Sequence, residues 1–327
     1  MKLFKCKKSK RNGINFGRNI KCHDAGQEIE NPGGYALYIM KNDKHLHLMY
    51  ITNSPTVAVI AERNSVDRIW VDLETLGKAK RQADFDSVKS NHTIEDISII
   101  RKVIQSAALL VRINPLHEGT KHEIEEVISR GADLIMLPMY HTTDDAKRFV
   151  DVVNGRAKTM LLLETIAAEE SVEETVSLSG ADEIHIGLND LHIEYKMKFM
   201  FELLANGKID AICETIKSGG IPYGFGGIAG LDEGGLLSAR IIIAEHYRLG
   251  SSMAILARSF CDSSNEKDIK RVESIFATGM KKIREYETFL KTAPSSFFEK
   301  NRMALKDEVK KIKENISTKC VGHEYKA

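Results

Sequence analysis

Two acidic residues, Glu164 and Asp190, close short apolar runs at residues 160–163 and 184–186. An amphipathic segment separates the runs, so the stretch predicts a strand, a helix and a second strand, the unit of a parallel sheet. Because neighbouring strands of such a sheet end on one face, the two carboxylates can meet around one hard divalent cation, Mg²⁺ or Mn²⁺, which prefers oxygen ligands. The alternative is that both acids simply begin the following loops or helices, where negative charge is favoured.

Polar residues close other apolar runs too. Asp72 and Glu74 follow the run at residues 69–71, and Arg112 and Asn114 follow the run at residues 108–111. An unpaired guanidinium in an apolar strand is costly, so Arg112 must meet an acid or a bound carboxylate. A structural ion pair with Asp72 or Glu74 and a contact with a substrate are both open from spacing alone.

Eight apolar runs with strand character recur between residues 46 and 262, and helical periodicity follows each but the last. Pro55 is expected to open the first helix, and Thr93 with Asp96 to form a capping box at the second. Strands alternating with helices are typical of a parallel sheet covered on both faces, and eight of them predict a (β/α)8 TIM barrel. A doubly wound open sheet is the alternative, but its glycine fingerprint after the first strand is absent.

A barrel places its chemistry at the carboxyl ends of the strands. The candidate substrate-binding residues at these ends are Arg112, Asn114, Gly187 and Asn189. Lys78 and Arg81, in "GKAKRQ" after the second strand, are candidates for binding an anionic tail of the substrate, although most such cations face solvent. Gly226 and Gly227 in "GFGGIA", expected after the seventh strand, can bind phosphate through backbone amides or form a plain tight turn.

The composition excludes some classes of protein. The 327 residues carry a net charge of +1, which gives no global reason to expect nucleic acid or membrane as a partner. The N-terminus lacks the apolar segment of a signal peptide, so we expect a cytoplasmic protein. The cysteines are odd in number and far apart, which predicts reduced thiols and no zinc site. They are Cys6, Cys22, Cys213, Cys261 and Cys320.

The two ends of the chain differ from its centre. Residues 1–45 form a basic extension, with eight Lys or Arg and no acid up to Cys22. This arm lacks interleaved aromatic residues, so a solvated tail is favoured over a nucleic-acid contact. Residues 263–327 are highly charged with helical periodicity, and the apolar positions of the first predicted helix must pack on something.

Five motifs in order resemble one family. They are "RIWVDLETLGKAKRQ", "LLVRINP", "GADLIMLPMY", "LLLET" and "GADEIHIGLNDL", and together they look like the HpcH/HpaI aldolase and citrate lyase beta-subunit superfamily of magnesium-dependent carbon–carbon lyases. The resemblance implies a TIM barrel, a divalent ion held by Glu164 and Asp190, and Arg112 on an oxygen of a 2-oxo acid. It gives Asp72 and Glu74 a catalytic role in ordering water and metal. It also implies a homo-oligomer joined through C-terminal helices.

Two departures from the family leave the reaction open. Thr75 stands where the aldolase branch has a histidine that is a candidate base, and Leu162 stands where that branch has glutamine. His92 and His185 are alternatives for proton transfer, although each can be a loop or packing residue. The favoured function is a metal-dependent aldolase or lyase acting on a small 2-oxo acid. The alternatives are a CoA-thioester lyase of the citrate lyase type and a non-catalytic subunit that binds a metal and a small acid.

Overall fold

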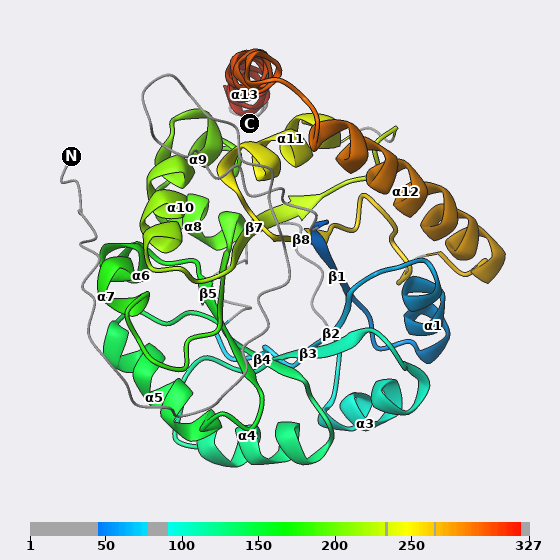
Figure 1. Cartoon of the computed structure of the whole chain (residues 1–327), viewed down its shortest axis with the longest axis vertical. Coiled ribbons are helices and arrows are strands. Elements are labelled where there is room, and N and C mark those ends of the chain that lie inside the picture. Colours follow the sequence, from blue (N-terminus) through cyan, green and yellow to red (C-terminus); the bar gives the residue numbers. More distant parts are fainter. Residues whose placement is uncertain (1–44, 78–90, 233–234, 265, 322–327) are drawn as a thin grey trace, which may run out of the picture. The chain divides into compact units, whose positions relative to one another are not determined.

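The computed structural model describes residues 45–77, 91–232, 235–264 and 266–321. Its eight parallel strands close into a barrel in the order β1 to β8, and helices surround them (Figure 1). The predicted (β/α)8 barrel is therefore confirmed. The strands are β1 His47–Ile51, β2 Arg68–Asp72, β3 Ala108–Arg112, β4 Leu134–Leu137, β5 Lys158–Leu163, β6 Glu183–Ile186, β7 Tyr223–Ile228 and β8 Met253–Leu256.

The helices that alternate with the strands begin and end close to the predicted positions. Pro55 stands at the first turn of its helix, and the Thr93 N–H donates to Asp96 Oδ2 at 2.7 Å in the predicted capping box. They are α1 Pro55–Arg63, α3 Ile94–Val103, α4 Thr120–Ser129, α5 Thr143–Val153, α6 Ile166–Glu170, α7 Val172–Thr175, α8 Leu188–Glu194, α9 Glu202–Ala205, α10 Lys208–Ser218 and α11 Ala239–Leu249.

Alternate residues of the strands fill the barrel interior. Trp70, Leu110, Met136 and Met160 belong to one buried cluster there, while the next residues along each strand pack against the helices. Successive side chains of a strand point to opposite faces, so residues 68, 70 and 72 of β2 all face inward. Because of this alternation, the last inward-facing residue of each strand lies near its carboxyl end, where the candidate site residues are found.

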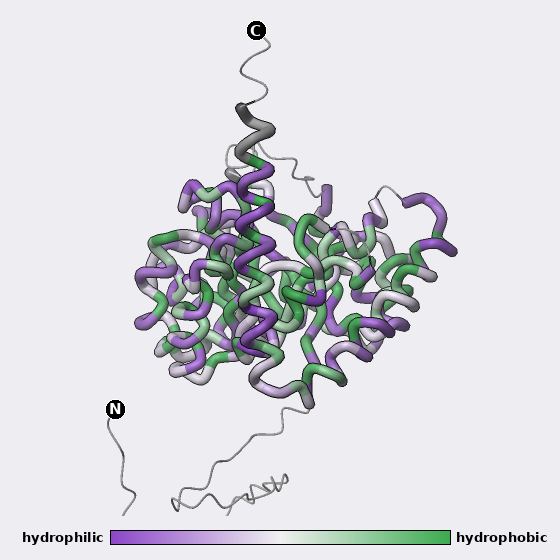
Figure 2. The backbone as a smooth tube through the Cα atoms, turned by 90° about the horizontal axis from the view of Figure 1, so that it is seen from above, coloured by the Kyte–Doolittle hydropathy of each residue, from purple (hydrophilic) through white to green (hydrophobic). Residues whose placement is uncertain are grey.

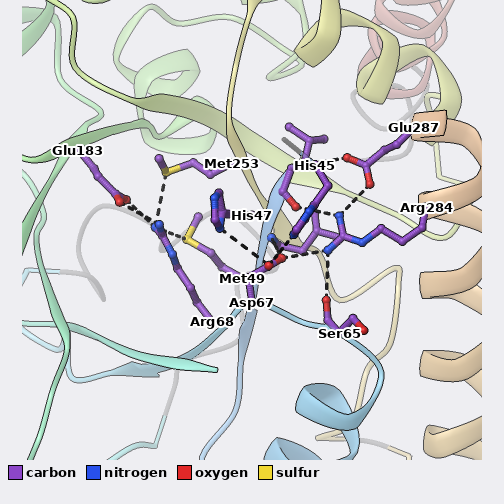
Figure 3. A network of polar contacts seen from close by, with 12 residues as sticks. His45, His47, Met49, Ser65, Asp67, Arg68, Glu183, Met253, Arg284 and Glu287 are labelled. Carbon is purple, nitrogen blue, oxygen red and sulfur yellow. Dashed lines mark hydrogen bonds and ion pairs between the residues drawn. The ribbon is translucent and has the colours of Figure 1, made fainter. Parts of the chain in front are cut away.

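A buried ion pair crosses the lower part of the interior. The Arg68 Nη2 donates to Glu183 Oε1 at 2.9 Å, and the sulfur atoms of Met49 and Met253 lie beside the guanidinium (Figure 3). β2 and β6 stand on opposite sides of the closed barrel, so this pair ties the two sides together. It lies near the amino ends of its strands, at the end opposite to the predicted active site.

Two long C-terminal helices pack on the barrel of their own chain. α12, Ile269–Leu290, lies against α1 and α11, and α13, Ser295–Val321, lies against α11 and α9. Hydrophilic and hydrophobic segments alternate along α13 (Figure 2). The Arg284 Nη2 fixes α12 by donating to Asp67 Oδ2 at 3.0 Å, while Glu287 Oε1 accepts the Leu46 N–H at 2.7 Å (Figure 3). Most apolar positions of the first C-terminal helix are thus covered within one chain, while Ile269 and Phe289 are exposed. The homo-oligomer stays a prediction.

Several predictions from the sequence lie outside the described residues, namely the basic extension, Lys78 and Arg81. Of the cysteines whose side chains are described, Cys213 and Cys261 are buried free thiols, as predicted. No helix among the described residues is long and apolar enough to cross a membrane.

Candidate active site

An ion-pair cluster lies at the carboxyl ends of β2 and β3. Arg112 Nε donates to Asp72 Oδ1 at 2.8 Å, and Arg112 Nη2 lies 2.9 Å from Asp72 Oδ2 and 3.2 Å from Glu74 Oε2. The guanidinium also lies 5.1 Å from the centre of the Trp70 ring. Although burial disfavours its charge, Asp72 and Glu74 raise the pKa of Arg112, so it stays cationic. The structural ion pair considered from the sequence is therefore present, and it does not exclude a contact with substrate.

Glu164 follows β5 and is buried at 3% exposure. Its Oε1 accepts the Met139 N–H at 3.0 Å. Burial, together with the negative charges of Asp190 and Glu74, raises the pKa of Glu164 well above its usual value, and Arg112 and the Met139 N–H oppose this only in part. A carboxyl group with such a raised pKa tends to stay protonated, and a bound cation would favour its ionised form.

Asp190 approaches Glu164 from the next unit of the barrel. It lies in the first turn of α8 and not directly at the end of β6. The prediction from the sequence placed Asp190 after β6, at the carboxyl end of the barrel, but did not include the helix that carries it. Gly187, the residue just before α8, packs against the Glu164 side chain, and the negative charge of Asp190 helps to raise the pKa of Glu164. Two neighbouring carboxylates fit Mg²⁺ or Mn²⁺, which keep water and substrate oxygens as further ligands. Within the described ranges, no group of three or more His, Cys, Asp or Glu side chains is placed to hold a metal.

Gly187 makes room for the Glu164 carboxylate. A Cβ atom at Gly187 would lie 2.8 Å from Glu164 Cβ and 2.9 Å from Glu164 Oε2. Its φ of −81° is ordinary, so the requirement for glycine comes from this close approach and not from backbone strain. Gly187 therefore shapes the acidic site, and its predicted contact with substrate stays a prediction.

We expect Gly187→Ala to displace the Glu164 carboxylate and to weaken metal binding at least about 10-fold, as the loss of an orienting partner does. Titration of Mn²⁺ followed by electron paramagnetic resonance measures this. Gly155→Ala is the matched control, because its φ of +67° makes alanine costly while no atom lies within 4 Å of the added Cβ. Equal metal affinity in the Gly187 variant and in the wild type would contradict the role assigned to Gly187.

Asn114 is engaged in holding the loop after β2. Its Oδ1 accepts the N–H groups of Thr75 at 2.9 Å and Leu76 at 3.0 Å, and its Nδ2 donates to Glu123 Oε1 at 2.8 Å. Asn189 lies partly exposed in the first turn of α8. The substrate contacts predicted for both asparagines stay predictions.

The glycines of "GFGGIA" lie within β7 and do not form a loop after it, which corrects their predicted place. A Cβ at Gly224 would meet the Met253 carbonyl oxygen at 2.2 Å, and Gly226 has a φ of +52° against the Leu188 side chain. The pairing of β7 with β8 shifts register between Gly224 and Gly227. Close packing and an irregular strand therefore account for these residues, including Gly227.

The two histidines considered for proton transfer lie at different depths. His92 Nδ1 accepts the Asp72 N–H at 2.9 Å, which places His92 at the end of the barrel that carries the acidic site. His185 is fully buried on β6, two residues above Glu183, and burial lowers the pKa of His185 to about 3. A buried imidazole that stays neutral fits the packing alternative for His185.

A cavity of about 980 Å³ lies at the opposite end of the barrel. Its lining includes His45, Arg101 and Arg284, which pair with acids: His45 and Arg284 with Asp67, and Arg101 with Asp133. A barrel of this type carries its chemistry at the carboxyl ends of the strands, so we place the candidate active site at Glu164 and not in this cavity.

Comparison with known proteins decides the family. Residues 46–205 match the family model "HpcH/HpaI aldolase/citrate lyase". The barrel belongs to this family. The protein is therefore of the aldolase or lyase type, and enzymes of this family generally use a divalent metal ion.

Solved structures share the fold at low sequence identity. An HpcH/HpaI aldolase from Desulfitobacterium hafniense is 16% identical with a TM-score of 0.50, covering 74% of this chain and 93% of its own. A family protein from Burkholderia cenocepacia is 13% identical with a TM-score of 0.54, covering 70% and 95%. The citrate synthase SbnG is 14% identical with a TM-score of 0.51, covering 74% and 96%. No curated protein matches the chain by sequence.

Proposed function

We propose that this protein is a divalent-metal-dependent lyase of the aldolase type, which makes or cleaves a carbon–carbon bond next to a small 2-oxo acid such as pyruvate or oxaloacetate. The observation that carries the proposal is that the buried Glu164 lies against the start of α8, which carries Asp190, at the barrel end that also holds Arg112. Family membership supports the reaction class, and the positions of these residues support the acid that it acts on.

The chemistry of the site follows from its charges. Glu164 and Asp190 would hold the metal, which when bound supplies Lewis-acid stabilisation of the negative charge on an enolate oxygen. Arg112 is a fixed cation that binds the carboxylate of the 2-oxo acid or the same developing oxyanion. Asp72 accepts hydrogen bonds from two nitrogen atoms of the guanidinium, so Arg112 is oriented before the substrate binds. Asp72 and Glu74 act through Arg112 and through water. No covalent nucleophile is required.

The CoA-thioester lyase is the second candidate, favoured by "VDLE" at residues 71–74. It needs cations for the CoA phosphates, and the residues proposed for this, Lys78 and Arg81, lie outside the described ranges. A non-catalytic binding subunit is the third candidate, because Thr75 replaces the histidine of the aldolase branch.

Isothermal titration of the purified protein with pyruvate, oxaloacetate and acetyl-CoA, each with and without Mg²⁺, tests these candidates. We expect binding of a 2-oxo acid only when the metal is present, because the acid and the metal share one site. Binding of acetyl-CoA in preference to both acids would favour the thioester lyase. If the folded protein binds no 2-oxo acid with Mg²⁺ present, the proposed function is wrong.

A further inference from the structure

A second cavity, of about 380 Å³, lies at the carboxyl end of the barrel, among the loops that follow β2, β3 and β4. Its wall includes Leu76, Pro115, Leu116, Met139 and Tyr140. The volume is in the range of small-molecule sites, about 300–1,000 Å³. Unlike the larger cavity at the other end, it lies on the face that carries Glu164.

The cavity shares a wall with the acidic site. The N–H of Met139 donates to Glu164 Oε1 at 3.0 Å, and Met139 also lines the cavity. Met139 has a φ of +51°, which is uncommon for a residue with a side chain and is found where the surroundings enforce it, often at functional sites. The next residue is fixed as well, because Thr165 Oγ1 donates to the Tyr140 carbonyl oxygen at 2.9 Å. One rigid loop thus serves both the metal-binding carboxylate and the cavity.

The opposite rim of the cavity is also held in place. The Leu76 N–H donates to Asn114 Oδ1 at 3.0 Å, and Asn114 Nδ2 in turn donates to Glu123 Oε1. Since the rim is fixed by hydrogen bonds, the cavity is formed before any ligand arrives, which lowers the entropic cost of binding.

The wall offers apolar surface. Two of its ionisable side chains already have partners: His117 Nδ1 accepts the Gly119 N–H at 3.0 Å, His117 Nε2 lies 3.1 Å from Glu123, and Asp145 caps α5. The exposed His141 also lines the cavity. None of the lining residues that the structure describes is Lys or Arg. The buried hydroxyl of Tyr140 has no hydrogen-bond partner among the described residues, and such groups are normally satisfied by water or a ligand.

We propose that this cavity binds the second substrate, and that this substrate is an aldehyde with a compact apolar body. The inference rests on the proposed function. In the condensation direction the carbon next to the keto group of the 2-oxo acid loses a proton, and its electron pair forms the new bond to the aldehyde carbon. The π pair of the aldehyde moves to its oxygen, which takes up a proton. The phosphates of a CoA thioester would find no cation among the described lining residues.

The test compares the wild type with Leu116→Trp, which fills the cavity, and with Met303→Trp, which places the same ring on a residue of α13 that is 67% exposed. Saturation-transfer NMR measures binding of benzaldehyde and glyceraldehyde to each protein. Mg²⁺-dependent exchange of the pyruvate methyl protons in D₂O reports on the metal and acid site alone. Steady-state kinetics with pyruvate and each aldehyde complete the comparison.

We expect kcat/KM for benzaldehyde to exceed that for glyceraldehyde about 10-fold or more, as apolar pockets discriminate. Leu116→Trp should lower kcat/KM and binding for benzaldehyde more than 10-fold while exchange of pyruvate continues, and Met303→Trp should change neither. Unchanged benzaldehyde binding in Leu116→Trp, or a preference for glyceraldehyde, would overturn the inference. Absence of proton exchange from pyruvate in the wild type would instead overturn the proposed function. In that case the benzaldehyde-binding measurements would still show whether the cavity binds an apolar aldehyde.

Discussion

Replacing Arg112 by Met is expected to remove 2-oxo-acid binding and to lower the free energy of unfolding by about 3–5 kcal/mol. Both effects have one cause. The guanidinium pairs with Asp72, whose side chain is 1% exposed, and with Glu74, whose side chain is 2% exposed, so its loss leaves buried carboxylates without this cation. The same cation is proposed to stabilise the developing oxyanion, and the loss of one such group costs about 100–1,000-fold in kcat. Urea denaturation and steady-state kinetics measure the two effects.

Arg156→Met is the matched control for this prediction. Arg156 also makes a two-point ion pair, with Glu125 at 2.6 and 2.8 Å, but on the surface, where such a pair contributes little. Arg112→Lys separates charge from geometry, because an ammonium cannot reproduce the two-point contact with Asp72. It should fold better than Arg112→Met and still bind the 2-oxo acid weakly. If either Arg112 variant keeps wild-type affinity for pyruvate, the structural ion pair is the whole role of this residue.

The strand ends could be predicted from the sequence because hydrophobic runs and polar terminations are local signals. Asp72, Arg112 and Glu164 each close a run of apolar residues, and a closed parallel barrel must bring these ends to one face. The alternation along β2 and β6 fixes depth as well: Arg68 pairs with Glu183 low in the barrel, so residues four positions further on reach its upper end. The fold and the acidic cluster therefore follow from pattern and topology.

Features that depend on contacts between distant segments could not be predicted in this way. Asp190 is carried by α8, a helix of one to two turns that is too short to show a period of its own. The amphipathic segment after Glu164 reads as one helix but is divided at Ser171 into α6 and α7. The positive φ of Met139 leaves no trace in the sequence, because neither glycine nor asparagine marks the position. The loop that joins the candidate metal site to the second cavity was consequently not predicted.

Replacing Glu164 by Gln is expected to abolish Mg²⁺-dependent 2-oxo-acid binding while making the metal-free protein more stable. The amide keeps an oxygen for the Met139 N–H and nearly the same volume, so the change removes charge and little else. The pKa of Glu164 is raised in the folded protein, which therefore holds this proton more tightly than the unfolded chain does. Ionised Glu164 thus costs stability, and the cost is absent below the usual value of 4.5 and grows as pH rises above it.

Thermal denaturation between pH 4 and pH 8, with and without Mg²⁺, measures this trade between stability and binding. Without metal, the Gln variant should melt on the order of 2–4 °C above the wild type near pH 7, since about 1 kcal/mol produces such a shift, and the two should converge toward pH 4. Mg²⁺ should stabilise the wild type by mass action and leave the variant unchanged. Glu125→Gln, on the surface, is the control and should respond to Mg²⁺ as the wild type does. A variant that still gains stability from Mg²⁺ and binds pyruvate would show that Glu164 is buried for packing, and that the metal is held elsewhere.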